Sequence, residues 1–367
     1  MPSVSLTAAA AARVADVRAS MRSHKIDGLV ITDLPSIRYL FGFSGSSAVV
    51  ILGRKTATFI TNDLYTVQVE QEVVKLPGTR IVIDRNVWSA VKQAGVGSSM
   101  KVVGYDASRT TVAALPVMKK ALAPAKLVDV GDLLSPVTQV KTKAEITSIS
   151  KAAAIASAAY ERMLGIVSAG MTEHQVATYL AATTRELGSE KDAFDIIVVA
   201  GARSAMPHGR ASHAKIKRGD VVTVDFGCTV NGLHSDMTRT FCVGVPRKDV
   251  VDVFAVLYDA HLNALDAAVA GVGAAALDAA ARSIIERAGY GECFKHSLGH
   301  GLGYEVHEHP RISWANKDGV VLENSVITIE PGIYLPGRFG MRIEDDVLVR
   351  RNGSKILTTA PRELVVV

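Results

Sequence analysis

The sequence predicts two domains, the first of which mixes helices and strands in the manner of an α/β domain. The chain has 367 residues, more than the roughly 250–300 residues at which single hydrophobic cores stop growing. Helix and strand patterns follow one another up to residue 134, as expected of an α/β domain. Ser135-Pro136 then interrupts the pattern. We place the boundary so that the domains are residues 1–138 and 139–367.

The first domain opens with helical spacing over residues 8–24. Short apolar runs rich in β-branched residues follow, which is typical of buried strands. These expected strands are residues 28–32, 48–52, 56–60 and 101–105. A turn at Gly53 separates the second run from the third, so we expect these two strands to form a hairpin.

The second domain begins with two helix start signals. Thr142 with Glu145, and Thr172 with Gln175, have capping-box spacing, in which each side chain bonds the backbone N–H of the other residue. The expected elements are helices ending near residues 166 and 188, strands over 195–200 and 220–228, helices over 249–270 and 274–288, and a strand-rich final stretch.

Composition excludes several classes of protein. Hydrophobic residues make up 48% and charged residues 21% of the chain, which is the composition of a folded globular protein. No apolar run reaches the roughly 18–20 residues of a membrane helix. The Ala-rich start, residues 6–12, is too short to span a membrane and has no basic residue before it. We therefore expect no signal peptide, no membrane partner and a cytoplasmic location.

The charge and the cysteines also argue against two kinds of site. Net charge is +5, but the basic residues are scattered and form no stripe with interleaved aromatics, so we expect no nucleic-acid partner. Cys228, Cys242 and Cys293 are odd in number and lack CxxC spacing. This excludes a disulfide framework and a thiolate zinc site, and we expect three small buried hydrophobic residues.

Two carboxylates stand where apolar strand residues are expected. Asp225 lies inside the run Val-Val-Thr-Val-Asp-Phe, and Asp236 follows the dipeptide Asn231-Gly232. Asn-Gly between two strand-like runs is the strongest short hairpin signal. If these two residues form the loop, Asp225 pairs with Thr238 and both carboxylates point to one face, roughly 5–8 Å apart.

Two more carboxylates stand in similar runs near the end of the chain. Glu330 ends the run Val-Ile-Thr-Ile, and Glu344 precedes Asp345 and Asp346. A turn around residues 336–340 could fold these runs into a second hairpin. Pro331-Gly332 favours a bulge, which leaves the register open, and the sequence alone does not choose between Glu344 and its two neighbours.

Electrostatics decides how four such acids are interpreted. Two like charges 4 Å apart cost about 4 kcal/mol at an effective dielectric constant of 20, so four clustered carboxylates protonate unless cations neutralise them. Two divalent ions supply the matching charge. Carboxylate oxygens suit Mn, Mg or Ca, and an imidazole ligand shifts the preference towards Mn, Co, Zn or Fe. The alternative is that each acid pairs with a nearby arginine, such as Arg239 or Arg342.

Histidines are concentrated in one segment. Four of the ten histidines lie between residues 296 and 309. Glycines on both sides of His300 allow close approach of the backbone, and no HExxH helix motif is present. His208, in a loop before the Asp225 strand, is a further candidate.

These motifs resemble the pita-bread metallopeptidases, which include aminopeptidase P, prolidase, methionine aminopeptidase and creatinase. The motifs are Val-Asp225-Phe-Gly, His-Ser-Asp236-Met-Thr-Arg-Thr, Gly-His300-Gly-Leu-Gly, Thr-Ile-Glu330-Pro-Gly and Arg-Ile-Glu344-Asp. Residues 37–45 resemble the amino domain of creatinase, prolidase and aminopeptidase P, which methionine aminopeptidases lack. The resemblance implies an α/β N-terminal domain plus an α+β pita-bread C-terminal catalytic domain.

The resemblance also implies a role for each residue of the site. Asp225 would bind one metal ion, Asp236 and Glu344 would bridge both ions, and His300 and Glu330 would complete the second. Glu330 would shuttle a proton to the leaving proline nitrogen. The expected substrate-side residues are the histidines that contact the scissile carbonyl and the proline pocket, His208, His307 and His296, and the residues that orient ligands and the tetrahedral intermediate, Tyr334 and Arg342.

The expected activity is dinuclear, metal-dependent hydrolysis of the bond before proline in small peptides. Mn(II) is the expected metal, with Zn or Co possible in the same site. Arg311 resembles the arginine with which prolidases bind the proline carboxylate, since a guanidinium forms two hydrogen bonds with a carboxylate. We therefore favour an Xaa-Pro dipeptidase. The alternatives are an Xaa-Pro aminopeptidase acting on longer peptides and a catalytically inactive binding protein, which the full ligand set disfavours. Relatives are commonly homodimers, and we expect one here.

Overall fold

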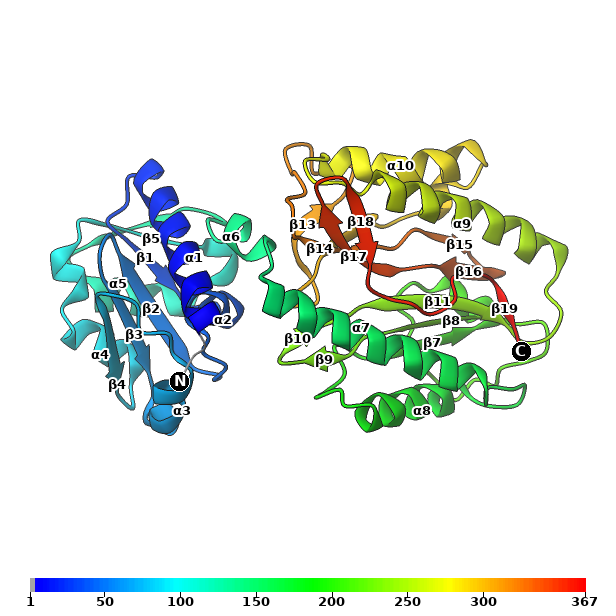
Figure 1. Cartoon of the computed structure of the whole chain (residues 1–367), viewed down its shortest axis with the longest axis horizontal. Helices are drawn as coiled ribbons and strands as arrows, with labels where there is room; N and C mark the ends of the chain where they lie inside the picture. Colours follow the sequence, from blue (N-terminus) through cyan, green and yellow to red (C-terminus); the bar gives the residue numbers. More distant parts are fainter. Residues whose placement is uncertain (1–3) are drawn as a thin grey trace. The chain divides into compact units, whose positions relative to one another are not determined.

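The computed structural model describes residues 4–367. The chain divides into two compact units, Met1–Thr138 and Gln139–Val367 (Figure 1). Among the described residues, no helix is long and apolar enough to cross a membrane.

The amino-terminal unit is an α/β domain built on one mixed, six-stranded sheet. Its strands, in the spatial order β4-β3-β2-β1-β5-β6, are β1 (Gly28–Ile31), β2 (Ala48–Gly53), β3 (Ala57–Thr61), β4 (Thr79–Ile83), β5 (Val102–Tyr105) and β6 (Lys126–Asp129). The α-helices are α1 (Val4–Ser23), α2 (Leu34–Phe41), α3 (Thr66–Glu72), α4 (Val87–Gln93) and α5 (Ala114–Leu122), with α6 (Ser135–Gln139) at the junction. The expected hairpin is confirmed, because β2 and β3 pair antiparallel.

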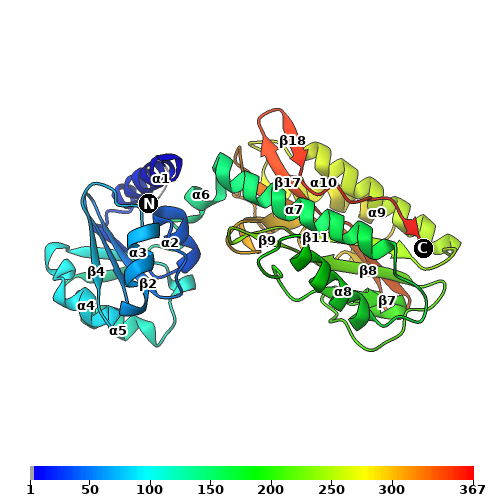
Figure 2. The ribbon, with the colours of Figure 1, turned by 60° about the horizontal axis from the view of Figure 1, so that its bottom comes forward.

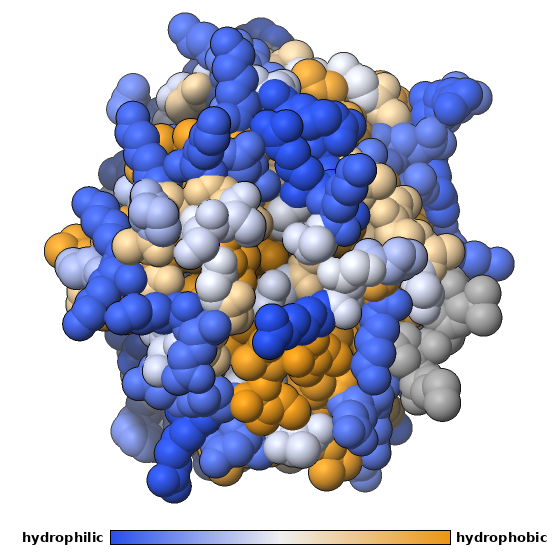
Figure 3. Space-filling model, turned by 90° about the vertical axis from the view of Figure 1, so that its left-hand side faces the viewer, coloured by the Kyte–Doolittle hydropathy of each residue, from blue (hydrophilic) through white to orange (hydrophobic). Residues whose placement is uncertain are grey.

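Helices cover both faces of this sheet because its strands are apolar on both sides. Successive residues of β1 alternate between two cores: Leu29 and Ile31 pack against α1 and α2, whereas Val30 packs against α4 and α5. Such nearly continuous apolar runs are typical of a sheet buried on both faces. Large hydrophobic side chains are also exposed on this unit, and Leu64 and Val67 are among them. Figure 3 shows hydrophobic residues gathered among charged ones on one face of the molecule.

The second unit has helix pairs on the outside of two sheets. The helices are α7 (Lys143–Leu164), α8 (Glu173–Glu186), α9 (Lys248–Ala267) and α10 (Ala274–Arg287). The four-stranded sheet, in the order β19-β11-β8-β7, contains β7 (Ile197–Ala200), β8 (Val221–Phe226), β11 (Met237–Cys242) and β19 (Val365–Val366). The five-stranded sheet, in the order β13-β12-β14-β17-β18, contains β12 (Gly299–Gly301), β13 (Glu308–Ile312), β14 (Val326–Ile329), β17 (Asp345–Arg350) and β18 (Gly353–Ile356). Two short ladders join β9 (Thr229–Val230) to β10 (Leu233–His234) and β15 (Gly332–Leu335) to β16 (Phe339–Arg342).

Each helix pair covers the apolar face of one group of strands. Helices α7 and α8 share a core with β7, β8 and β11, beside which Figure 2 shows them. Helices α9 and α10 share a core with β14, β15, β16 and β17, and Figure 1 shows the strands between the two helix pairs. Both expected capping boxes are formed, at Thr142 and at Thr172. The α+β prediction for this unit is confirmed.

The strands of the second unit also have polar faces, which meet between the core of α7 and α8 and the core of α9 and α10. On β8, Val224 and Phe226 pack against α7 and α8, so the side chain of Asp225, between them, points to the opposite face. Hydrogen bonds cross to the other strands from this face: Thr240 Oγ1 donates to the carbonyl oxygen of Arg342 over 2.9 Å. Polar residues therefore gather on the side of β8 and β11 that faces away from α7 and α8.

The predicted register of the first hairpin is correct. Asn231 and Gly232 have φ values of 52° and 72°, as the two central residues of a type I′ turn require. Thr238 pairs with Asp225 along β8 and β11, as expected from placing the loop at these two residues.

The predicted bulge near Pro331 is wrong. Ile329 pairs with Asp345, and three residues further along the strand Gly332 pairs with Arg342. Equal numbers of residues lie between these pairs on the two strands, whereas a bulge would add one to a single strand. The chain instead leaves one sheet and enters another at Glu330 and Glu344, with the register unchanged.

The three cysteines are free thiols. Cys228 and Cys242 are buried and Cys293 is half-buried. Burial raises the pKa of the Cys228 thiol to about 12 and that of Cys242 to about 11, so neither is a reactive thiolate at neutral pH.

Candidate metal centre

Four carboxylates and one imidazole converge between the two sheets. Ligand atoms of Asp236, His300 and Glu344 all lie within 4.8 Å of one another, and the three residues are buried. Glu330 Oε1 lies 3.5 Å from His300 Nε2. Asp225 lies close enough that its charge, after burial, helps to raise the pKa values of Asp236 and Glu344. The five residues expected to bind metal are thus brought together by β8, β11, β12 and the strand junction at residues 330 and 344.

His300 presents a free lone pair to these carboxylates. Its Nδ1 lies 3.0 Å from the carbonyl oxygen of Gly301, which can only accept, so Nδ1 carries the proton and Nε2 does not. Nε2 lies 3.7 Å from Asp236 Oδ2. Burial first, and then the neighbouring His307, lowers the pKa of His300 to about 3. The imidazole is therefore neutral, as a metal ligand must be.

The two glycines beside His300 are required by close packing of the backbone. A Cβ on Gly299 would lie 2.0 Å from the carbonyl oxygen of Thr328, and one on Gly301 would lie 2.1 Å from that of His309. Both contacts are far shorter than any real Cβ makes. Only glycine lets β12 lie between its neighbours here, which fixes the position of the imidazole.

Burial and mutual repulsion disfavour the ionised acids. Burial first, and then Glu344 and Asp225, raises the pKa of Asp236 well above its ordinary value. Burial and Glu344 do the same for Glu330. Burial and Asp225 raise the pKa of Glu344 to about 8. These carboxylates become fully ionised at neutral pH only if cations lie among them, so the electrostatics fits a metal site.

Asp225 has one oxygen paired and one oxygen without a partner. Arg342 donates to Oδ2 over 2.5 Å, which is the arginine pairing that the sequence left open as an alternative. Among the described residues, Oδ1 is buried and has no hydrogen-bond partner. Leaving a buried acceptor unpaired costs about 1–3 kcal/mol, and more when it is charged. A metal ion is a suitable partner for this oxygen.

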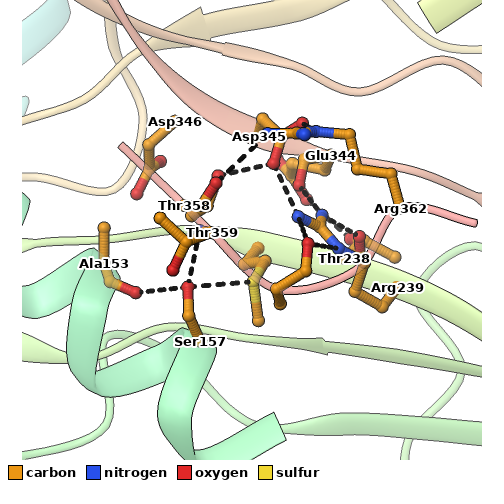
Figure 4. Close-up of polar contacts among 12 residues, drawn as sticks. Ala153, Ser157, Thr238, Arg239, Glu344, Asp345, Asp346, Thr358, Thr359 and Arg362 are labelled. Atoms are coloured by element: carbon orange, nitrogen blue, oxygen red, sulfur yellow. Dashed lines mark hydrogen bonds and ion pairs between the residues drawn. The ribbon is translucent and has the colours of Figure 1, made fainter. Parts of the chain in front are cut away.

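The structure distinguishes Glu344 from Asp345, which the sequence could not do. Figure 4 shows Asp345 among the polar residues Thr358, Arg239 and Arg362. Its oxygens accept from Arg239 over 2.7 Å, His261 over 2.8 Å and Thr358 over 2.5 Å, and also from Arg362. Burial alone would raise the pKa of Asp345, yet Arg239, His261 and Arg362 hold it well below its ordinary value. Asp345 is therefore fully paired.

The Asp346 carboxylate bonds to the backbone of Asp236, a candidate metal ligand. Both of its carboxylate oxygens lie 3.2 Å from the backbone nitrogen of Asp236, which donates to them. Burial raises its pKa well above the ordinary value. Glu344 is thus the acid of this run that belongs to the group of clustered ligand atoms.

The expected substrate-side residues lie beside this cluster. The ring of His307 is 4.4 Å from that of His300, centroid to centroid. His296 Nε2 accepts from the Tyr334 hydroxyl over 3.0 Å, because His296 Nδ1 donates to the carbonyl oxygen of Ser297. Arg342 in turn donates to the Tyr334 oxygen over 2.7 Å. Burial raises the pKa of Tyr334 to about 12, so the hydroxyl keeps its proton.

His208 and Arg311 approach the same place from the surface. His208 follows η4 (Gly201–Ala205), is exposed, and its charge contributes to the lowered pKa values of His296 and His307. Arg311, on β13, is exposed, and its charge contributes, after burial, to the lowered pKa values of His300 and His307. Among the described residues Arg311 has no ion-pair partner, so its guanidinium is available to an anion.

Comparisons with known proteins agree with this geometry. Residues 147–351 match the model of metallopeptidase family M24, and residues 13–137 match that of the creatinase/prolidase N-terminal domain. The chain belongs to metallopeptidase family M24. The family resemblance, the two-part fold and the assignment as a metallopeptidase are thereby confirmed.

Several M24 relatives match over nearly the whole chain. An Xaa-Pro dipeptidase of Pyrococcus horikoshii is 36% identical over 94% of this chain and 96% of its own length, and the uncharacterized peptidase YqhT of Bacillus subtilis is 35% identical over 93% and 96%. The structure of an Xaa-Pro dipeptidase from Bacillus anthracis matches with a TM-score of 0.93 at 34% identity, covering 98% of this chain and all of that one. That of an X-Pro aminopeptidase from Thermotoga maritima matches with a TM-score of 0.84 at 38% identity, covering 95% and 100%.

Thr238, which orients one of the candidate metal ligands, was not singled out from the sequence. The Thr238 hydroxyl donates to Glu344 Oε2 over 2.6 Å and accepts from Arg342 Nε over 3.0 Å. It thus orients a metal-ligand candidate and the arginine that holds Asp225. The hairpin register, which places Thr238 opposite Asp225, is the signal that could have identified it.

Proposed function

We propose that this chain hydrolyses the peptide bond that precedes proline and acts as an Xaa-Pro dipeptidase with two divalent metal ions. The observation that supports it most is the group of four carboxylates around one neutral imidazole, in a chain that matches Xaa-Pro dipeptidases over nearly its full length. Four acidic charges match two divalent cations, and the carboxylate-rich donor set favours Mn(II) over Zn or Co.

The residues that would bind the ions are Asp225, Asp236, His300, Glu330 and Glu344. When bound, the ions would polarise the scissile carbonyl and lower the pKa of water. Asp236 and Glu344 are the proposed bridging ligands, which is compatible with ligand atoms that lie within 4.8 Å of each other. The role of Thr238 is to keep the Glu344 carboxylate in one orientation through a 2.6 Å hydrogen bond, as ligand-orienting groups do.

Glu330 is the proposed general acid and base. Its carboxylate would take a proton from the attacking water and then release it to the leaving proline nitrogen, acting first as general base and then as general acid. His208 and His307 would donate to the scissile carbonyl oxygen and line the proline side. His296 is already bonded to Tyr334, so it would shape the pocket rather than transfer protons.

Arg311 would determine the preference for dipeptides. It is exposed and lies near His300 and His307, where a proline carboxylate would end. A bidentate hydrogen bond to that carboxylate would favour Xaa-Pro over longer peptides. The alternative is an Xaa-Pro aminopeptidase, the activity named for the Thermotoga maritima structure at 38% identity.

Turnover of Xaa-Pro against Xaa-Pro-Yaa peptides tests the proposal. We expect hydrolysis of Xaa-Pro to be the more efficient by at least tenfold in kcat/KM, about the 1.4 kcal/mol that one good ion pair supplies. Comparable efficiency on tripeptides would replace the dipeptidase with the aminopeptidase. Homodimer formation, cytoplasmic location and the roles of the individual residues stay predictions from the family resemblance.

A further inference from the structure

One arginine outside the metal centre lies between two aromatic rings. The guanidinium carbon of Arg282, on α10, is 4.1 Å from the ring centroid of Phe294 and 4.3 Å from that of Trp314. Phe294 meets the ring of His296 edge-on at 5.1 Å, and His296 lies 5.6 Å from Tyr334. A continuous series of contacts therefore joins the half-exposed Trp314 to the proline side of the site.

The same arginine also fixes the backbone of the segment that carries His296. Its Nη1 donates to the carbonyl oxygen of Phe294 over 2.9 Å and its Nη2 to that of His296 over 2.8 Å. Asp278, one helical turn earlier, pairs with Arg282 over 2.6 Å and accepts from the backbone nitrogen of Leu298 over 3.0 Å. Two side chains of α10 thus hold the segment 294–298 at three backbone atoms.

This segment is bonded directly to the candidate general acid and base. The carbonyl oxygen of Leu298 accepts from the backbone nitrogen of Glu330 over 2.8 Å. His300 follows two residues later. The arrangement of His296 relative to Glu330 therefore depends on where the segment 294–298 lies.

The pair is not needed to attach α10 to the fold. Leu277, Ala281 and Ile285 already pack that helix into the core. Asp278 is fully buried and the Arg282 side chain is 15% exposed, and removing such charges from water costs several kcal/mol. Replacement by apolar residues would often be neutral for stability, so stability alone does not account for this pair.

We propose that Arg282, paired with Asp278 and stacked between Phe294 and Trp314, is a positioning residue that sets His296 for binding of the proline side of the substrate. The inference rests on the proposed function for the identity of that substrate. The stacking needs a planar guanidinium, and the two carbonyl bonds need a forked donor, so lysine would replace neither feature.

Kinetics of single and double variants test this role. Arg282→Met is expected to lower kcat/KM for Xaa-Pro by about 10- to 100-fold, mainly through KM, because misplacement of a contacting group by about 1 Å has effects of that size. Arg282→Lys should recover only part of the loss. Arg287→Met, an exposed arginine later on the same helix, is the matched control and should change kcat/KM by less than about twofold.

The double variant separates positioning from a purely structural role. If Arg282 acts through His296, the two substitutions remove one function. Adding Arg282→Met to a His296→Asn enzyme should then lower kcat/KM by less than about a further twofold. Equal fold losses in both backgrounds would overturn the inference, as would an Arg282→Met enzyme with the parental KM.

Fluorescence gives a readout that needs no activity. The chain has two tryptophans, so Trp88→Phe leaves Trp314 as the single reporter. In that background His296→Asn should shift the Trp314 emission, and the shift should vanish when Arg282→Met is added. An emission that does not respond to His296→Asn would refute the coupling. If the parent enzyme hydrolyses no Xaa-Pro peptide, the proposed function fails, and this fluorescence cycle still decides the inference.

Discussion

Replacing Thr238 by valine removes one oxygen atom that holds two residues of the site. The hydroxyl donates to Glu344 over 2.6 Å and accepts from Arg342 over 3.0 Å, and Thr238 is fully buried. Valine has nearly the same shape, so the change affects hydrogen bonding more than packing. Each bond to a charged group contributes about 1.5–3 kcal/mol. Arg342 keeps its bonds to Asp225 and Tyr334. The expected loss in the metal-bound enzyme is therefore that of one hydrogen bond, from Thr238 to Glu344.

The expected result is a loss of about 10- to 100-fold in Mn(II) affinity or in kcat/KM, since each tenfold step is about 1.4 kcal/mol. Calorimetric titration of the metal-stripped protein with Mn(II) measures the affinity, and kinetics at saturating metal measure kcat/KM. Thr184→Val is the control, because Thr184 is equally buried on α8 and its hydroxyl donates to the carbonyl oxygen of Ala181, with no bond to a charged group among the described residues. A Thr238→Val enzyme with the affinity and kinetics of the control would refute the ligand-orienting role.

Two further predictions concern charge. In the metal-stripped chain, the free energy of unfolding should fall as the pH rises from about 7, where the histidines of the unfolded chain have mostly lost their protons, to about 8, the pKa of Glu344 in the folded chain. Over this range Glu344 binds its proton more tightly in the folded than in the unfolded state, so raising the pH favours unfolding. Urea unfolding across that range measures this slope. Saturating Mn(II) should reverse the slope and Glu344→Gln should reduce it, whereas a slope of the opposite sign in the metal-stripped chain would contradict the clustering of the acids. Separately, Arg311→Ala should raise KM for Xaa-Pro at least tenfold and leave KM for the corresponding Xaa-Pro amides unchanged, and equal effects on acid and amide would show that Arg311 does not bind the carboxylate.

Local signals predicted the first half of the candidate site well. The Asn231-Gly232 dipeptide takes the two positive φ angles of a tight turn, and a tight turn allows one register only, so the pairing of Asp225 with Thr238 followed from counting residues. The glycines beside His300 likewise indicated close backbone packing, which the 2.0 Å and 2.1 Å approaches confirm.

The second half depended on tertiary structure that no local pattern encodes. The strands before and after Glu330 belong to different sheets, so a proline and a glycine that suggested a bulge mark a change of sheet instead. Glu344, Asp345 and Asp346 are consecutive acids, and what distinguishes them is the set of partners, such as Arg239 and His261, that other elements bring to Asp345. The contact of Arg282 with the His296 segment also joins separate elements, and no local pattern in the sequence indicates it.

The central claim is that Asp225, Asp236, Glu330 and Glu344 are gathered around metal ions that the hydrolysis requires. The most direct test is to strip the purified chain with a chelator, reload it with Mn(II), and measure bound metal by mass spectrometry alongside Xaa-Pro turnover. We predict about two ions per chain on reloading, turnover lost on stripping and restored on reloading. A stripped chain that binds no metal, or that turns over Xaa-Pro as fast as the reloaded one, would contradict the account.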